Sequence, residues 1–550
     1  MFDERLHGTP STEPEKEFIS MKARRNWRWF TIAALVGVGV VYPGVAASGD
    51  SAVGSSGNLA PSAVLTVDHA TKVANGAALR PLKSVPLGNL FINRPTVPMS
   101  EYRAAKQQRV PASRPDAGPA PLVPVHLGGF AGITQATAED TWPPDINGAV
   151  GKGGFADGYN VQVVNQHYTA YHKGTVPGAA ICDMSYNTRT GNAANSMFDP
   201  RIEYDPYWDR WVDQVESSGA SQHQYLMISL SGNPCGAYWI YDIGGVNTIA
   251  CGGTSPFWDY PQIALSQDAV VLTANCFNST GYVGAKVIGF SKARLYNGLG
   301  VSVPIYTVAC GTTTPNEVID ANPRMHLLAR CGSVMNVEFR NPQTALYSAI
   351  AAVTPVAGLA PSTPAAAGQA GCSVASCTID TSDGRYVNPG TQYGDSLWAV
   401  ASWGLLATPR WAEIDTEGAA ANTLKQGGIT FLSNCSADYN ASIAATIDGR
   451  AWLNWTSSAP PSCAGGAFTS INAASRLSSD AAGTMPSIGS VAVSCCTLTG
   501  NFDPDFGTQR WGDTSSVSTD PSAGDRAWYW NEVAASSSIW GTRSHLIRNP

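Results

Sequence analysis

Short apolar runs separated by polar turns fill the chain from about residue 142 onward. Gly, Asn, Asp and Pro mark the turns between these runs, which is typical of strands joined by tight connections. No apolar pattern with a helical period continues for more than about two turns. The chain is therefore predicted to be all-β. Two consecutive stretches show the pattern, with strands expected at 201–205, 210–215, 224–230 and 237–241, then at 262–266, 269–275, 285–290 and 305–308.

An Asp or Asn stands just before a strand-like run at seven places, 43 to 75 residues apart. A repeat of this size indicates one supersecondary unit that is copied until its members bury a shared core. Four strands per unit without intervening helices are typical of a propeller blade. We therefore predict a seven-bladed β-propeller over residues 125–550, with six or eight blades as the alternatives. The seven positions are Asp145, Asp199, Asp259, Asn322, Asp395, Asp438 and Asp513.

The first 47 residues have the layout of a secretory signal. A basic segment at 21–28 precedes an apolar run at 29–41, and small residues follow at 45–47. The run is short for a bilayer span, so no stable membrane span is expected after cleavage; an uncleaved anchor is the alternative. Charged residues precede the basic segment, which makes Met21 an alternative start. Residues 48–120 are rich in Ala, Pro, Ser and Gly and predict a disordered, low-complexity stalk.

The number and position of the cysteines favour an extracellular location. All twelve lie between Cys182 and Cys496, and an even number in an exported chain indicates disulfides. Cys372 and Cys377 are near enough in sequence to pair locally. The adjacent Cys495 and Cys496 are expected to reach separate partners, because a vicinal bridge strains the backbone. We expect a secreted, periplasmic or cell-surface protein.

The charge of the chain limits the classes of partner that it can bind. The net charge is −7 and charged residues make up 14% of the chain. A mildly acidic surface argues against nucleic acid and against anionic lipid as partners. We expect a monomer whose partner is a glycan or another cell-surface ligand.

Several segments of the chain resemble secreted bacterial sialidase-like β-propeller proteins. One of them reads Asp199-Pro-Arg-Ile-Glu-Tyr and continues to Trp211. The resemblance covers about residues 125–548 and implies a propeller fold. It implies no activity, because the group is largely uncharacterised in function. The segments that carry the resemblance are 142–151, 199–211, 258–261, 475–486, 510–521 and 540–543.

The seven Asp and Asn positions are the first candidate site. In a propeller the inner strand of each blade begins near the central funnel, so residues just before it can line the axial opening. Carboxylates and amides bind sugar hydroxyls, and their oxygens are ligands for Ca²⁺. The sequence fixes no cofactor, and Ca²⁺ is the one this pattern suggests. The alternative is that each side chain caps a turn or ties one blade to the next.

Arginine and aromatic residues beside these positions extend the candidate site. Arg201 and Arg324 each follow the Asp or Asn by two residues. If they converge on the funnel they suit a uronic or sialic acid, since guanidinium pairs with carboxylate through two parallel hydrogen bonds. An ion pair between blades is the alternative. Tyr260 and Trp511 are candidates for stacking on a sugar ring, with packing between blades as the alternative.

The predicted function is binding of a glycan or another extracellular ligand at the central funnel. The alternative is a carbohydrate-active enzyme, either a glycoside hydrolase with two carboxylates or a polysaccharide lyase with an Arg-bound uronate and a base. No catalytic residue is assigned. The repeated Asp-boxes of sialidases are missing, and the esterase-like tetrapeptide at 394–397 lacks the expected α/β context. In the enzyme alternative the carboxylate candidates are Asp145, Asp199, Asp259 and Asp513.

Overall fold

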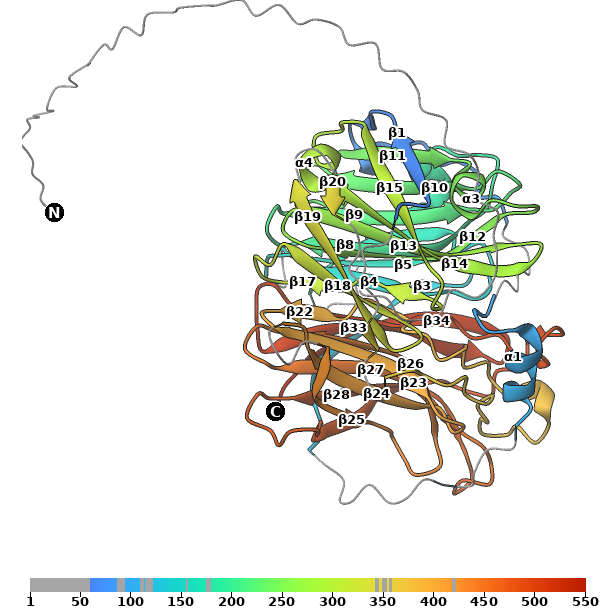
Figure 1. Ribbon diagram of the computed structural model, residues 1–550. Helices are drawn as coiled ribbons and strands as arrows, with labels where there is room; N and C mark the ends of the chain where they lie inside the picture. Colours follow the sequence, from blue (N-terminus) through green and yellow to red (C-terminus); the bar gives the residue numbers. More distant parts are fainter. Residues whose placement is uncertain are drawn as a thin grey trace, which may run out of the picture. The chain divides into compact units, whose positions relative to one another are not determined.

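The computed structural model divides between Ala52 and Val53, and its second unit extends to Pro550. All described residues belong to the second unit (Figure 1). The predicted signal segment, 1–47, and the first part of the predicted stalk, 48–59, lie outside the described residues. The described residues are 60–86, 94–108, 113, 122–154, 157–174, 180–341, 346–348, 354–355, 359–417 and 422–550.

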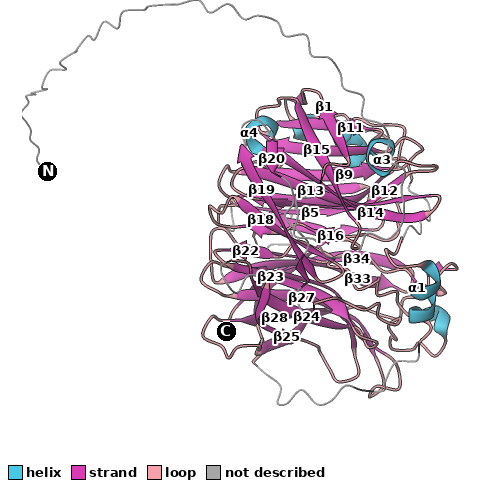
Figure 2. Ribbon diagram, viewed as in Figure 1, coloured by secondary structure: helices cyan, strands magenta, loops and turns pink. Residues whose placement is uncertain are grey.

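Three antiparallel sheets of consecutive strands form the first half of a β-propeller, and strands dominate the whole unit (Figure 2). Strand order follows the chain because short turns join antiparallel neighbours. The all-β prediction is confirmed. The three sheets contain β4 (Asn147–Val150), β5 (Tyr159–Val164), β6 (His167–His172) and β7 (Ala180–Ser185); β8 (Met197–Asp205), β9 (Arg210–Ser217), β10 (His223–Ser229) and β11 (Tyr238–Gly244); and β12 (Phe257–Leu265), β13 (Ala269–Asn278), β14 (Gly281–Ser291) and β15 (Val301–Val308).

The second half closes the ring with strands from both parts of the chain. The N-terminal strand β3 pairs antiparallel with β34, so the last blade joins the two ends of the propeller (Figure 1). In the first blade of this half, β17 pairs parallel with β22. The sheets contain β17 (Glu317–Val318), β22 (Thr391–Tyr393), β23 (Ser396–Trp403), β24 (Thr408–Asp415) and β25 (Thr423–Ile429); β26 (Ala437–Ala445), β27 (Ala451–Ala459), β28 (Ala467–Arg476) and β29 (Ser487–Val493); and β32 (Ser516–Thr519), β33 (Arg526–Ser536), β34 (Ile539–Arg548) and β3 (Val125–Thr134).

The described residues form six blades around the axis, whereas seven were predicted. The inner strands β4, β8, β12, β17 with β22, β26 and β32 contact one another in this order and close the ring. A further sheet places no strand in this ring. It was counted as a blade because Asn322-Pro-Arg imitates Asp199-Pro-Arg, yet the strand that follows Asn322 pairs only within its own sheet. That sheet contains β16 (Thr313–Thr314), β18 (Arg324–Ala329), β19 (Ser333–Asn341), β20 (Leu346–Ser348) and β21 (Thr354–Pro355).

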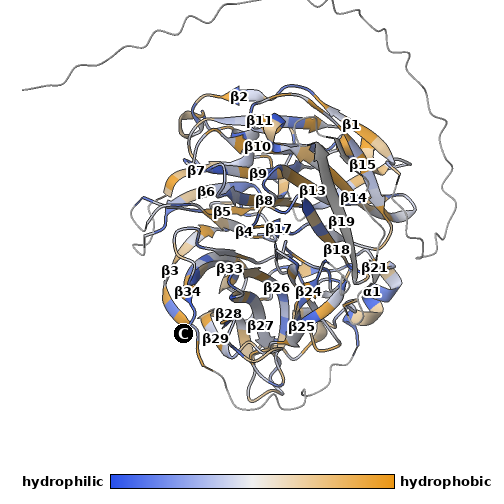
Figure 3. Cartoon of the chain, turned by 60° about the vertical axis from the view of Figure 1, so that its left-hand side comes forward, coloured by the Kyte–Doolittle hydropathy of each residue, from blue (hydrophilic) through white to orange (hydrophobic). Residues whose placement is uncertain are grey.

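The hydrophobic core lies between neighbouring sheets. Hydropathy changes repeatedly along single strands, as expected when the two faces of a strand meet different surroundings (Figure 3). Trp530 of the last blade packs against β4 at Gly148, where any Cβ would collide with the indole ring. Glycine at this position therefore allows the first and last blades to approach closely. Several tryptophans are almost completely buried, among them Trp211, Trp258, Trp398, Trp455, Trp528 and Trp540.

Part of the predicted stalk belongs to the folded unit. β1 (Ala63–Val67) pairs with β15 and β2 (Thr71–Val73) pairs with β11, each as a fifth, outer strand. Leu65 and Val67 enter the core of the third blade. Low apolar content predicted disorder for residues 48–120, but two buried side chains on one face of β1, Leu65 and Val67, are enough to complete an existing sheet edge.

Short helices and a small ribbon complete the described structure, in loops and in the N-terminal segment. No helix in the described part of the chain is long and apolar enough to cross a membrane. These elements are η1 (Gly76–Ala78), α1 (Met99–Lys106), α2 (Tyr186–Thr190), α3 (Val246–Cys251), α4 (Lys292–Leu295), η2 (Ala375–Cys377), β30 (Phe502–Asp503) and β31 (Thr508–Gln509).

All twelve cysteines form disulfides. The local pair predicted between Cys372 and Cys377 is confirmed. The prediction that Cys495 and Cys496 reach separate partners is wrong: they bond to each other, because the other ten cysteines pair among themselves. Six disulfides indicate an oxidising environment. The remaining bridges are Cys182–Cys235, Cys251–Cys276, Cys310–Cys331 and Cys435–Cys463.

Strand β1 offers a test of whether the N-terminal segment contributes to stability. Leu65 is 1% exposed, while its neighbour Thr66 lies on the exposed face of the same strand. Leu65→Ala is expected to lower the free energy of unfolding by about 2–5 kcal/mol, because it leaves a cavity in the core. Thr66→Ala should change it by no more than about 0.5 kcal/mol. Denaturant titration of both variants measures the difference, and equal effects would place β1 outside the cooperative unit.

Candidate functional site

The inner strands begin with an irregular backbone that places polar residues where the blades meet. Asp145, Asp199, Tyr260 and Asn440 have φ of 44°, 50°, 57° and 51°, a region that residues other than glycine rarely adopt. In β8, β12 and β26 the pairing register shifts at this point, which marks a bulge.

The bulges correct the register predicted from the sequence. The structural counterparts of Asp199 are Tyr260 and Asn440, and not the predicted Asp259 and Asp438. The sequence could not show this, because a bulge inserts a residue without changing the apolar pattern on either side. Asn440, which donates a hydrogen bond to the carbonyl of Gly512, was missed.

Asp145 and Asp199 join neighbouring blades. Asp145 Oδ1 accepts a hydrogen bond from the backbone N–H of Asp513 at 2.6 Å, and its Oδ2 accepts one from Asn165 Nδ2 at 2.7 Å. Asp199 Oδ2 accepts one from the backbone N–H of Tyr260 at 3.1 Å. The alternative of blade-tying Asp side chains therefore describes both residues.

A cluster of three carboxylates lies at this end of the axis. Asp199 on β8, Glu216 on β9 and Asp259 on β12 each offer an oxygen, and these oxygens all lie within 4.8 Å of one another. Burial raises the pKa of all three, well above the usual range for Asp199 and Glu216 and to about 7 for Asp259. The negative charges of Asp199 and Asp259 raise the pKa of Glu216 further. Burial also raises the pKa of Asp145, to about 6. The cluster of Asp199, Glu216 and Asp259 could therefore hold a cation or share protons.

The predicted arginines do not converge at the axis. Arg201 is buried and is held by the structure itself, since its Nε donates to the carbonyl of Pro261 at 3.0 Å and its Nη1 donates to Asn388 Oδ1 at 2.7 Å. Arg324 begins β18, which lies outside the ring, and its side chain is exposed. The predicted pairing of these two arginines around one carboxylate is therefore not formed.

Of three further predicted positions, one lies at the axis and two lie away from it. Asp513 lies at the axis, where Arg510 holds it through two hydrogen bonds of 2.6 Å. Asp395 lies in the turn between β22 and β23 and pairs with Lys425 on the surface. Asn322 donates a hydrogen bond to Glu417 at 3.1 Å.

Asp438 and the two aromatic candidates are structural. Asp438 is fully buried and accepts hydrogen bonds from the Trp455 indole at 2.8 Å and from Ser436 Oγ at 2.7 Å. Trp511 is 1% exposed and belongs to the core between the first and last blades. Tyr260 is 3% exposed, and its ring lies under Arg385, 4.4 Å from the guanidinium carbon. Both rings are buried and pack between blades, which agrees with the packing alternative.

The N-terminal segment packs beside these carboxylates. Tyr102 Oη, in α1, donates to both oxygens of Asp380 at 2.6 and 2.8 Å, and Lys106 Nζ lies 3.1 Å from the same carboxylate. The backbone N–H of Thr96 donates to Asp383 Oδ2 at 2.9 Å. Arg94, in the same segment, lies near enough to Asp259 to lower its pKa.

The opposite ends of the inner strands line an open pocket. Residues of β4, β8, β17, β22, β26 and β32 contribute to it, so five of the six blades meet there. Two half-buried glutamates face it, Glu203 on β8 and Glu317 on β17. Polar groups surround them, among them Asn388, Thr391, Ser516, Ser518 and Thr519.

The two pocket glutamates have raised pKa values. Burial raises the pKa of Glu317 to about 8, although Leu265 N–H donates a hydrogen bond to its Oε1 at 2.9 Å. Burial also raises the pKa of Glu203 well above its usual range, and the charge of Glu317 raises it further. Sequence reasoning missed both residues. For Glu203 a signal existed, since it follows Arg201 by two positions and so lies on the same face of the strand.

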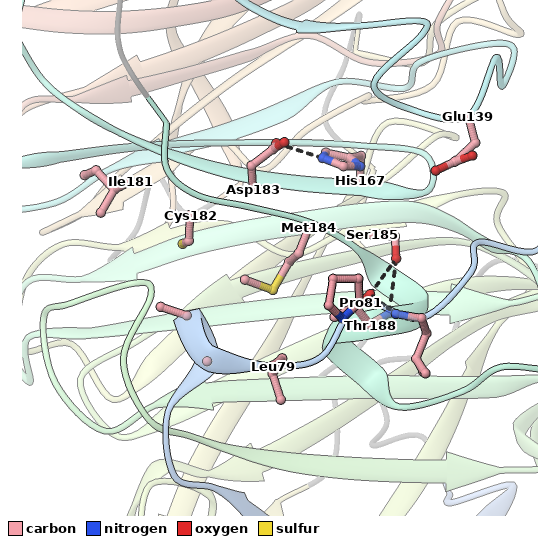
Figure 4. Close-up of a pocket in the computed structure, with 13 residues that line it drawn as sticks. Leu79, Pro81, Glu139, His167, Ile181, Cys182, Asp183, Met184, Ser185 and Thr188 are labelled. Carbon is pink, nitrogen blue, oxygen red and sulfur yellow. Dashed lines mark hydrogen bonds and ion pairs between the residues drawn. The ribbon is translucent and has the colours of Figure 1, made fainter.

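A second pocket lies away from the axis, between the segment after η1 and the edge strand β7 (Figure 4). His167 Nε2 lies 2.8 Å from Asp183 Oδ1 there. The nearby Ser185 caps α2 by accepting a hydrogen bond from the backbone N–H of Thr188 at 3.2 Å. This hydroxyl is therefore committed to the helix and does not complete a nucleophile–His–Asp arrangement.

Comparison with known proteins gives distant structural neighbours. No family model and no curated protein matches the chain. The solved structures include a subtype N10 neuraminidase-like protein of A/little yellow-shouldered bat/Guatemala/060/2010, which is 8% identical with a TM-score of 0.32 over 61% of this chain and 94% of that one. The α-L-arabinofuranosidase PaAbf62A from Podospora anserina is 13% identical, with a TM-score of 0.25 over 53% of this chain and 91% of that one. Saccharomyces cerevisiae Sqt1 is 6% identical, with a TM-score of 0.34 over 78% of this chain and 100% of that one. Similarity this low transfers no activity, and membership of a bacterial sialidase-like group stays a prediction.

A comparison of variants at Asp438 and Asp395 tests whether the buried Asp438 stabilises the fold. Asp438→Ala is expected to lower the free energy of unfolding by about 3 kcal/mol, because it leaves the buried Trp455 indole N–H and other donors without an acceptor. Asp395→Ala removes only a surface ion pair and should cost less than about 1 kcal/mol. Thermal and denaturant unfolding compare the two variants. A larger effect at Asp395 would contradict the assignment.

The axial carboxylates predict a pH dependence of stability. Their pKa values are raised in the folded state, to about 6 for Asp145 and about 7 for Asp259, so the folded chain holds protons that the unfolded chain releases above about pH 4. Stability from these groups is complete at low pH and is lost as the pH rises through 6 and 7. In EDTA, the melting temperature should fall between about pH 5 and pH 8. Asp259→Asn should reduce this fall, whereas the surface variant Asp395→Asn should not. A rise in melting temperature over this range would contradict the pKa assignment.

Proposed function

We propose that the protein is exported and binds a glycan in the axial pocket between the inner strands. The observation that carries this proposal is the pair of half-buried glutamates, Glu203 and Glu317, in an open pocket built by five blades. Ligand pockets in proteins combine a concave surface with a few convergent polar groups, and this pocket has both. The predicted site is thereby moved from the N-terminal to the C-terminal ends of the inner strands.

The lining chemistry suits a neutral, hydroxyl-rich ligand. With a pKa of about 8, Glu317 is mostly protonated at neutral pH and can donate a hydrogen bond as well as accept one. The amide of Asn388 and the hydroxyls of Thr391 and Ser516 also serve as donors and acceptors. Sugar hydroxyls both donate and accept hydrogen bonds, so a pocket that binds them needs donors as well as acceptors.

The second candidate function is glycoside hydrolysis at the same pocket. A hydrolase needs one carboxylic acid that protonates the leaving group and one carboxylate that acts as nucleophile or base. The charge of Glu317 raises the pKa of Glu203, which indicates that the two groups are close enough to divide these roles. Glu203 is the candidate acid, because burial and the charge of Glu317 raise its pKa well above the usual range, and Glu317 is the candidate carboxylate.

The proposed cellular location is based on the disulfides. Six bridges support a secreted, periplasmic or cell-surface location, as predicted from the signal-like segment. In this proposal the protein acts as a monomer, its partner is an extracellular glycan, and nucleic acid is not a ligand.

The test measures binding and cleavage on the same samples. The oxidised protein is run through gels containing neutral, uronate-containing or sialylated polysaccharide, and the same mixtures are assayed for new reducing ends. Retardation by at least one neutral polysaccharide is expected. Glu203→Gln and Glu317→Gln should weaken it by at least about tenfold, because each replaces a carboxyl oxygen that can accept a hydrogen bond with an NH₂ group that can only donate.

Glu413 provides the matched control. It is partly buried, like the pocket residues, but lies on β24 and holds Ser396 and Gln426 through hydrogen bonds of 2.7 and 2.6 Å. Glu413→Gln should leave retardation unchanged. New reducing ends that are lost in Glu317→Gln would establish the hydrolase. The absence of both retardation and product with every polysaccharide, or equal loss in Glu413→Gln, would refute the pocket assignment.

A further inference from the structure

We propose that Asp199, Glu216 and Asp259 bind a divalent cation, and that Ca²⁺ fits the site best. The site lies at the N-terminal ends of the inner strands, whereas the glycan pocket lies at their C-terminal ends. It therefore does not depend on the proposed glycan binding. Its role would be to hold the second and third blades together.

The geometry allows one ion to contact all three side chains. Their oxygens lie within 4.8 Å of one another. Ca²⁺ binds oxygens at about 2.4 Å, so two ligands on opposite sides of the ion are about 4.8 Å apart. Mg²⁺ requires a nearly ideal octahedron at about 2.1 Å and gives up its waters reluctantly, whereas Ca²⁺ accepts irregular sets of carboxylate oxygens. A site made only of carboxylates from three strands therefore favours Ca²⁺.

Glu216 is the second, independent sign of a ligand. Its side chain is 0% exposed, and neither carboxylate oxygen has a hydrogen-bond partner among the described residues. The backbone N–H of Tyr260 lies nearby but donates to Asp199 Oδ2 at 3.1 Å. A buried carboxylate without a donor costs several kcal/mol unless it is neutralised. A cation between Glu216, Asp199 and Asp259 supplies that neutralisation.

Most positive side chains of this region are held by other groups, whereas Arg94, whose charge lowers the pKa of Asp259, lies over the Phe257 ring at 4.0 Å. Arg510 pairs with Asp513, Arg385 with Asp383, and Lys106 with Asp380. Arg201 directs its Nε to the carbonyl of Pro261 and its Nη1 to Asn388. Within the described residues no ion pair involves Asp199, Glu216 or Asp259, so none of the three carboxylates has a cationic side chain in direct contact, although nearby arginines lower their pKa values.

The three ligands come from positions that the fold fixes. Asp199 is the bulge residue of β8, and Glu216 lies on β9 opposite Phe198, the residue before Asp199. Asp259 precedes the bulge of β12 in the next blade. Because two blades share the site, binding of the ion is linked to their packing and should raise the melting temperature.

The experiment uses the full oxidised chain after dialysis against EDTA. CaCl₂ is added at neutral pH, and the melting temperature and the heat of binding are measured. Calorimetry in two buffers with different ionisation enthalpies also reports proton release, which is expected because the ion displaces protons from the carboxyl groups. Wild-type protein should bind Ca²⁺ with an increase in melting temperature, and MgCl₂ should produce a smaller one.

Two variants separate ion binding from folding defects. Glu216→Gln keeps the side-chain volume and Asp259→Asn removes a charge from the neighbouring blade; both should bind Ca²⁺ at least about tenfold more weakly. Asp395→Asn, at the surface, should bind like wild type. The proposal is overturned if wild-type protein shows neither heat nor a thermal shift with Ca²⁺, which would leave shared protons as the neutralising partner. Unchanged affinity in a folded Glu216→Gln variant would overturn it as well.

Discussion

The concentration of carboxyl groups near the propeller axis is the constraint on which the rest of the structure depends. Carboxyl groups from neighbouring blades, Asp145, Asp199, Asp259 and Asp513, lie near enough there to influence one another's pKa values. In a buried setting such charges repel strongly, because little water is present to screen them. The chain meets this constraint with backbone N–H groups at Asp145 and Asp199 and with a guanidinium at Asp513. Glu216 receives none of these partners, which makes it chemically distinct.

The same arrangement makes the two ends of the axis different. At the N-terminal ends of the inner strands, α1 and the residues around Asp380 engage each other through buried ion pairs. At the other ends, the strands diverge around an open, polar pocket. The segment 386–388 connects the two regions: its carbonyl groups accept hydrogen bonds from Gln262 and Tyr260, and Asn388 both holds Arg201 and lines the pocket.

The fold class was predictable from the sequence, whereas the candidate site was predictable only in part. Alternating apolar runs and turn residues specify strands locally, so the all-β propeller follows. The blade number depends on which strands reach the axis, and Asn322-Pro-Arg shows that a local motif does not decide this. Bulges moved the register at Tyr260 and Asn440 without leaving a trace in the apolar pattern. Glu216 and Glu317 were missed because a single glutamate within a strand carries no local signal, and their surroundings are made by distant parts of the chain.

The pairing of β3 with β34 has a consequence for how the protein forms. Residues Val125–Thr134 are made early, but their hydrogen-bonding partner, Ile539–Arg548, is made some 400 residues later. Until that partner emerges, β3 has an unsatisfied edge, and the first blade lacks the neighbour against which Gly148 and Trp530 pack. The ring is thus completed after synthesis of its last strand, which compels a growing chain to wait in an open, aggregation-prone form. We therefore expect the rate at which the folded ring forms to depend on closure between β3 and β34 more than on the folding of any single blade.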